Sequence, residues 1–128
     1  MLSDLRGVIP PIATPFDAQG NVVHSALADC VEFQIGAGVH GLIPGGSTGE
    51  GHTFEREDFA RMFETVAKAN RGRLPLLAGL IVNSTQEAII RGQMVRDLGA
   101  VGLQVTPVHY LFKPDEESTV AHFRAVAE

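Results

Sequence analysis

Short apolar runs alternate with longer amphipathic segments four times along this chain. The runs cover residues 8–13, 41–43, 74–80 and 101–106. Runs of this length are typical of parallel strands that are covered on both faces. The alternation therefore predicts repeated βα units that build a parallel sheet.

The segments between the runs carry apolar residues at helical spacing. Positions three and four residues apart share one face of a helix, so each stripe predicts a helix that packs this face on a core. The stripes are Leu27, Cys30, Val31 and Ile35; Phe59, Met62, Phe63, Val66 and Ala67; Ala88, Gly92 and Val95; and Val120, Phe123 and Ala127.

Local signals predict where these helices begin and end. Thr53 stands before an acidic stretch and suits the start of the second helix. Ser84 and Glu87 have the spacing of a capping box. The pattern Gly-x-x-Gly-Leu occurs at 38–42 and again at 99–103. We expect its first glycine to close a helix in a left-handed conformation, after which the next strand begins.

A doubly wound sheet and a barrel both consist of such units. A doubly wound nucleotide binder would carry G-x-G-x-x-G after its first strand. Here the first run leads into Ala-Thr-Pro-Phe-Asp at 13–17, which favours the barrel. A (β/α)8 barrel takes about 250 residues. Residues 1–128 are therefore expected to be the N-terminal half of a barrel, with the second half absent from the chain.

Composition narrows the function classes. The chain has 45% hydrophobic and 20% charged residues and a formal charge of −5, which indicates a globular protein and disfavours nucleic acid as a partner. Cys30 is the single cysteine, so a disulfide framework is excluded. The sequence shows neither a signal peptide nor an apolar run long enough for a membrane span. We expect a cytoplasmic protein.

The densest chemical signal is the loop Gly-Gly-Ser-Thr-Gly-Glu-Gly at 45–51, directly after the second run. Glycines let backbone N–H groups approach a ligand, and Ser47 and Thr48 add hydroxyl donors. These groups suit a small carboxylate. A phosphate loop is disfavoured because no G-K-[ST] follows. The alternative is a turn whose hydroxyls cap the next helix.

Within this loop, the segment Gly-Ser-Thr-Gly-Glu at 46–50 resembles the G-[ST]-T-G-E signature of the dihydrodipicolinate synthase and N-acetylneuraminate lyase family. Residues 12–16, 75–79 and 105–107 resemble the family's first, third and fourth strands. The resemblance implies a (β/α)8 barrel that binds pyruvate or a related 2-oxo acid through a lysine Schiff base, without a cofactor.

The resemblance also implies residue roles. Thr48 would hold the substrate carboxylate, and Ser47 would take part in a proton relay, in a position that is threonine in many relatives. Glu50 would be structural. Relatives often carry two adjacent tyrosines after the fourth strand, one of which completes the relay in a neighbouring subunit. Tyr110, the only tyrosine, is the candidate here, although His109 could fill this position and Tyr110 could instead be a packing residue.

The lysine that the family needs belongs to a later strand. The two lysines of this chain, Lys68 and Lys113, fall in the second helix and in a loop. No metal site is expected, because the five histidines lack ligand spacing.

Two functions remain open on the sequence alone. In the first, the chain is part of a Schiff-base lyase whose full-length form is a homo-oligomer, a dimer or tetramer. The 128-residue chain by itself is then expected to be inactive. The second is a non-catalytic half-barrel that binds a small carboxylate or assembles with a partner chain.

Overall fold

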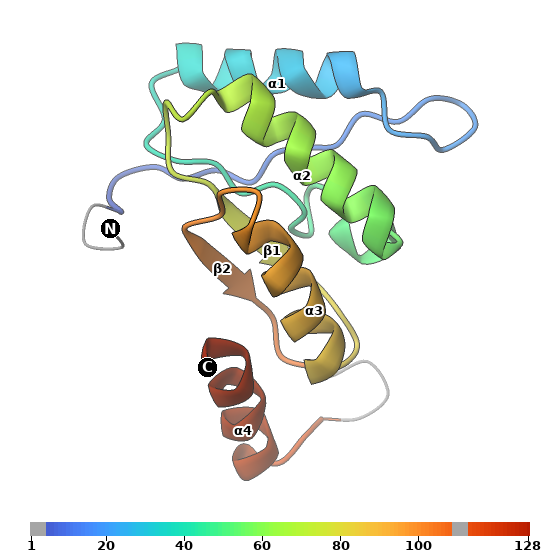
Figure 1. The fold of residues 1–128 in the computed structure, drawn as a ribbon, viewed down its shortest axis with the longest axis vertical. Coiled ribbons are helices and arrows are strands. Elements are labelled where there is room, and N and C mark those ends of the chain that lie inside the picture. The colour runs from blue at the N-terminus through green and yellow to red at the C-terminus, as the bar shows by residue number, and fades with distance from the viewer. Residues whose placement is uncertain (1–4, 109–112) are drawn as a thin grey trace.

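The computed structural model describes residues 5–108 and 113–128 as alternating helices and short strands (Figure 1). No helix in these segments is long and apolar enough to cross a membrane. The elements in chain order are α1 His24–Gly36, the 3-10 helix η2 Gly51–Thr53, α2 Arg56–Asn70, β1 Leu77–Leu80, α3 Thr85–Arg96, β2 Gly102–Val105 and α4 Glu116–Ala127.

Four extended segments run parallel, each beside the one that precedes it in sequence. Pro11 bridges Ile43, Leu42 bridges Leu76, and β1 pairs with β2, all in parallel. This sequential order is that of neighbouring strands in a barrel, whereas the strand order of a doubly wound sheet reverses at its switch point. The predicted succession of parallel βα units is confirmed.

The first two predicted strands are reduced to isolated bridges, one for the first segment and two for the second. Pro10 and Pro11 have no N–H to donate, so a regular ladder cannot form along the first segment. The pairing that remains runs through Ile12 N, which donates to Ile43 O at 3.0 Å, and through Ile43 N, which donates to Pro10 O at 3.0 Å. Pro44 follows at once and shortens the second segment in the same way.

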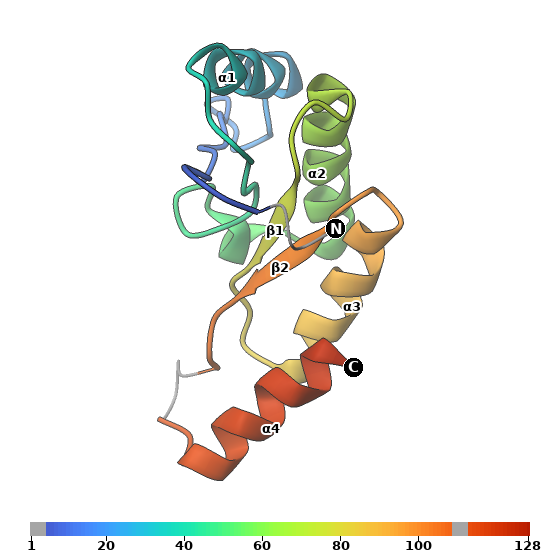
Figure 2. The ribbon, with the colours of Figure 1, turned by 90° about the vertical axis from the view of Figure 1, so that its left-hand side faces the viewer.

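Helices α1, α2 and α3 build the core against the strands. Figure 2 shows α2 and α3 on the same side of β1 and β2. The predicted packing stripes of α1 and α2 are confirmed, since their central residues are fully buried. The buried core comprises Ile12, Leu27, Val31, Leu42, Phe54, Phe59, Met62, Phe63, Val66, Leu76, Ala78, Leu80 and Val95.

Helix ends follow the local signals in most places. Gly38 and Gly99 have φ of 78° and 94°, so both Gly-x-x-Gly-Leu turns use a left-handed glycine as predicted. The Ser84 side chain accepts from Glu87 N at 3.1 Å and caps α3. These turns set the direction in which each chain segment returns to the sheet.

Helix α4 does not bury the predicted stripe. Val120 and Phe123 are 49% and 39% exposed, and Ala127 is exposed as well. The buried residue is His122, whose Nδ1 lies 2.9 Å from the Thr85 hydroxyl. The expectation that this stripe packs into the core is wrong for the described chain, because the helix turns an adjacent face to α3 and no described segment covers the stripe.

Candidate active site

The loop of residues 45–53 lies at the carboxyl edge of the parallel strands. Near the end of β1, Gly79 N donates to Pro44 O at 2.8 Å, immediately before the loop. At the end of β2, Thr106 N donates to Leu80 O at 3.3 Å. The strand ends therefore meet around the loop, on the edge where barrel enzymes carry their active sites.

Two glycines are required by the way the loop packs. Gly45 has a φ of +75°, and a Cβ there would lie 2.6 Å from Cε2 of Phe59. A Cβ on Gly79 would run into the backbone of Gly46. A larger residue at either position would have to move backbone or a core ring. The loop is thus seated directly on β1 and α2.

Hydrogen bonds within the loop hold it as one tight turn. Gly46 O accepts from Gly49 N and from Gly51 N, both at 3.1 Å. Thr14, at the end of the first strand segment, donates its buried hydroxyl to Gly49 O at 2.8 Å. The loop is consequently fixed both internally and to the neighbouring strand.

Ser47 and Thr48 stand side by side in this turn, and both are exposed. Across residues 5–108 and 113–128, neither their hydroxyls nor their backbone N–H groups have a hydrogen-bond partner. A rigid turn therefore leaves two N–H and two O–H donors for a ligand, a set that suits a small anion such as a carboxylate.

Neither the Ser47 hydroxyl nor the Thr48 hydroxyl caps a helix. Thr53 donates its hydroxyl to Glu50 O at 2.8 Å within η2, while α2 begins at Arg56 after Glu55 without a side-chain cap. The predicted cap by Thr53 on α2 is wrong, because the intervening 3-10 turn engages it first. The alternative that Ser47 and Thr48 cap the next helix is wrong as well.

One residue near the loop was not predicted from the sequence. Gln104 lies in β2 opposite Gly79, and its Oε1 comes within 3.6 Å of the position a Cβ on Gly46 would take. It is the one amide in an otherwise apolar run, and this was the available signal. Its carboxamide adds a donor and an acceptor beside the loop.

The remaining predicted site residues are separate from this cluster. Tyr110 and its alternative His109 lie outside the described residues. Lys68 lies in α2, as predicted, on the solvated face of the helix. Its side chain is 73% exposed and pairs with Glu64 Oε1 at 2.8 Å. Lys113 is exposed and belongs to no strand. Neither described lysine side chain reaches the loop.

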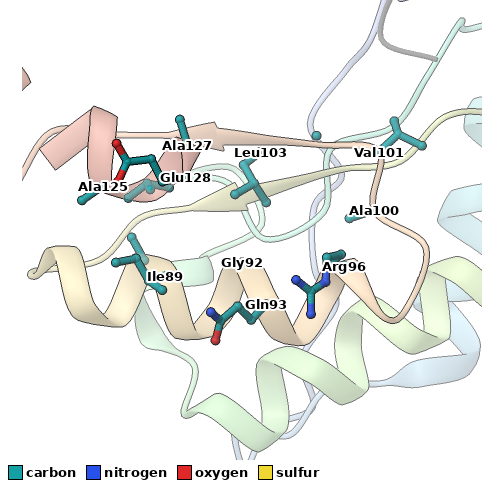
Figure 3. Close-up of a pocket in the computed structure, with 13 residues that line it drawn as sticks. Ile89, Gly92, Gln93, Arg96, Ala100, Val101, Leu103, Ala125, Ala127 and Glu128 are labelled. Atoms are coloured by element: carbon teal, nitrogen blue, oxygen red, sulfur yellow. The ribbon is translucent and has the colours of Figure 1, made fainter.

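A separate groove lies at the opposite end of β2. It measures about 290 Å³ between α3, the start of β2 and the end of α4, next to Gly92 and Leu103 (Figure 3). Its lining residues include none from the loop, so it is not part of the candidate site. In the described segments, no three His, Cys, Asp or Glu side chains are grouped to hold a metal ion.

Comparisons with known proteins agree with this architecture. The dihydrodipicolinate synthetase family matches residues 4–128. The chain is 43% identical over 122 residues to the 4-hydroxy-tetrahydrodipicolinate synthase of Phenylobacterium zucineum, covering 94% of this chain and 40% of that protein. Dihydrodipicolinate synthase from Acinetobacter baumannii, complexed with pyruvate, superposes with a TM-score of 0.90 at 32% identity, covering 95% of this chain and 42% of that one. A catalytic lysine mutant of Ruminococcus gnavus sialic acid aldolase superposes with a TM-score of 0.89 at 25% identity, covering 99% and 41%.

The sequential parallel strands, the outer helices and the glycine loop at the carboxyl edge define the front of a (β/α)8 barrel, of which this chain supplies about the first four βα units. The chain belongs to the dihydrodipicolinate synthetase family. The relationship to aldolase-type lyases that the motif at 46–50 indicated is confirmed at the level of the family. The chain spans about two-fifths of the length of the relatives it matches.

Proposed function

We propose that these residues form the carboxylate-binding half of a lyase that acts on pyruvate or a related 2-oxo acid through a lysine Schiff base. The observation that supports this most directly is the fixed turn at 46–49, whose exposed donors have no partner in the described chain. The Acinetobacter baumannii relative, which is complexed with pyruvate, supports the choice of ligand.

Two residues of the turn and one residue later in the chain have proposed roles. Thr48 binds the substrate carboxylate with its hydroxyl and N–H. Ser47 passes a proton during the chemical step, and Tyr110 completes the relay. A hydroxyl that only binds acts on the ground state and the transition state alike, whereas a relay hydroxyl acts in the transition state.

The nucleophilic lysine is proposed to lie on a later strand, outside these 128 residues. Lys68 is salt-bridged on a solvated helix face, whereas a nucleophilic lysine needs a site inside an apolar pocket. The Ruminococcus gnavus relative, named for a catalytic lysine, supports this mechanism. The chain alone is therefore expected to bind but not to react, and the whole enzyme to work as a homo-oligomer, a dimer or tetramer.

A second function is favoured by the edge of β2. Its residues are half-buried or exposed, while those of β1 are mostly buried. An unpaired strand edge recruits other chains. The chain would then be a half-barrel that binds a carboxylate without turning it over, or one that assembles with a partner chain.

Pyruvate titration and trapping test the first function. We expect pyruvate to shift the amide resonances of Ser47 and Thr48 in the 128-residue chain, and Thr48→Val to weaken this binding. Borohydride added to the mixture should leave the mass unchanged. The same trapping on a protein that joins this chain to a second half should add one reduced pyruvate.

A reduced adduct on Lys68 or Lys113 would overturn the proposed place of the nucleophile. No resonance shift at the turn would overturn its carboxylate role. Light scattering addresses the second function, because pairing through the edge of β2 predicts dimers, and a stable monomer at high concentration would contradict it.

A further inference from the structure

Helix α3 carries a buried arginine on its packing face. Arg91 is only 7% exposed and lies between Ala88 and Val95, the buried apolar residues of the same helix. A charged group at such a position costs free energy unless it is hydrogen-bonded and paired. Its partners therefore indicate why the residue is there.

The guanidinium is bonded to the chain that leaves the glycine loop. Nη1 donates to Gly51 O at 3.0 Å, and Nη2 donates to Phe54 O at 2.6 Å. These two carbonyls lie at the two ends of η2, three residues apart. A planar guanidinium can hold both at once, which the single ammonium of a lysine cannot do in the same geometry.

Other contacts keep this guanidinium in place. Its carbon lies 5.0 Å from the centre of the Phe59 ring, the ring against which Gly45 packs. Its Nε donates to Glu87 Oε1 at 2.8 Å, while Glu87 Oε2 accepts from Arg56 Nε at 2.9 Å. Two helices thus hold the arginine from one side, and the loop rests on its other side.

We propose that Arg91 is a positioning residue that fixes the loop in the shape in which Ser47 and Thr48 present their donors. Gly51 connects the arginine to the turn, since its N–H donates to Gly46 O and its carbonyl accepts from Arg91. The ligand part of this inference rests on the proposed carboxylate function. The part that concerns loop order does not need a ligand.

Amide hydrogen exchange on the full 128-residue chain measures loop order. In Arg91→Met both carbonyls lose their donor, so the amides of Gly49, Glu50 and Gly51 should exchange at least about tenfold faster, while the buried amides of α1 keep their protection. Arg91→Lys keeps the charge and should show a smaller increase at the same amides. It also serves as the test if the methionine variant does not fold.

Arg96→Lys is the matched control. Arg96 lies on the same helix, its side chain is 72% exposed, and within residues 5–108 and 113–128 its ion pair is with Asp97, so this change should leave loop exchange unaltered. Pyruvate titration of the same proteins should show weaker binding in both Arg91 variants and unchanged binding in Arg96→Lys.

Three outcomes are informative. Loop amides that stay as protected as in the wild type would overturn the proposal, and so would exchange that rises equally throughout the chain, because the role would then be general stability. Absence of pyruvate binding in the wild type contradicts the proposed function instead, while the exchange comparison still decides whether Arg91 holds the loop.

Discussion

Strands β1 and β2 are neighbours of equal length, yet they lie in different surroundings. Three residues of β1 are buried, with the second strand segment on one side and β2 on the other. None of the four residues of β2 is buried, and α4 beyond it buries only His122. The strand segment that leads into the loop has a paired neighbour on each side, whereas β2 has a described neighbour on one side only. The site region can therefore be ordered although the sheet ends at β2 in the described chain.

The largest effect should come from truncating the packed side. Phe63 in α2 is fully buried, whereas Phe123 in α4 is 39% exposed. Phe63→Ala should cost about 3–5 kcal/mol of unfolding free energy, and Phe123→Ala less than about 1 kcal/mol. Urea unfolding of the two variants measures the contrast. Equal losses would mean that α4 is as well packed as α2, which would contradict the difference in burial between the two helices.

This contrast also explains what could be predicted from the sequence. The stripes of α1 and α2 were predicted correctly because these helices bury one face and little else competes with that pattern. The stripe with Val120 and Phe123 was misread, since an apolar stripe predicts a packing face but not whether the packing partner belongs to the described chain.

The site was predictable only in part for a related reason. The loop with Ser47 and Thr48 is one continuous segment, so its residues could be found together. Gln104 and Arg91 reach it from elements more than 35 residues away in the chain, and a sequence pattern contains no register between strands. A buried arginine also looks like an ordinary solvated residue until its carbonyl partners are known.

The loop combines a packed base with an open tip. Ser47→Ala in a complete enzyme should lower kcat by about 10²-fold if this hydroxyl moves a proton. Thr48→Val should mainly raise KM, by about tenfold, for one lost hydrogen bond to a charged group. Neither hydroxyl has a partner in the described chain, so both variants should keep wild-type melting temperatures.

Steady-state kinetics and thermal melts separate these roles. An unchanged kcat in Ser47→Ala would remove Ser47 from the relay, and an unchanged KM in Thr48→Val would remove the hydroxyl of Thr48 from carboxylate binding. A loss of about 1 kcal/mol in both variants with normal kinetics would show that the two hydroxyls stabilise the fold and take no part in the reaction.

Substitution at the base of the loop should lower stability, unlike substitution of the two hydroxyls at its tip. Gly79→Ala places a methyl group against the backbone of Gly46 and should cost about 1–3 kcal/mol. Gly36→Ala, at the end of α1, meets nothing within 4 Å and should be neutral or stabilising by up to about 1 kcal/mol. Chemical unfolding compares the two. A neutral Gly79→Ala would show that the loop shifts easily and is not seated on β1.

The smallest effect is expected from acid, and it distinguishes a carboxylate near the loop from one remote from it. Hydrogen bonds from Arg56 and then Arg91 lower the pKa of Glu87 from its ordinary 4.5. Arg73 and then Arg71 lower the pKa of Glu32, at α1, to about 2.

Each group is a carboxylate with a depressed folded-state pKa, so its contribution to stability is present above pH 4.5 and is lost as the pH falls through the folded-state value. Glu87→Gln should therefore flatten the acid limb of stability and remove the acid-induced loss of amide protection at Gly51, whereas Glu32→Gln should flatten the limb at lower pH and leave the protection of the loop unchanged. Melting curves and amide exchange recorded from pH 7 down to about pH 2 test this, and an acid response of the loop that survives in Glu87→Gln would show that the Glu87–Arg91 pair does not support it.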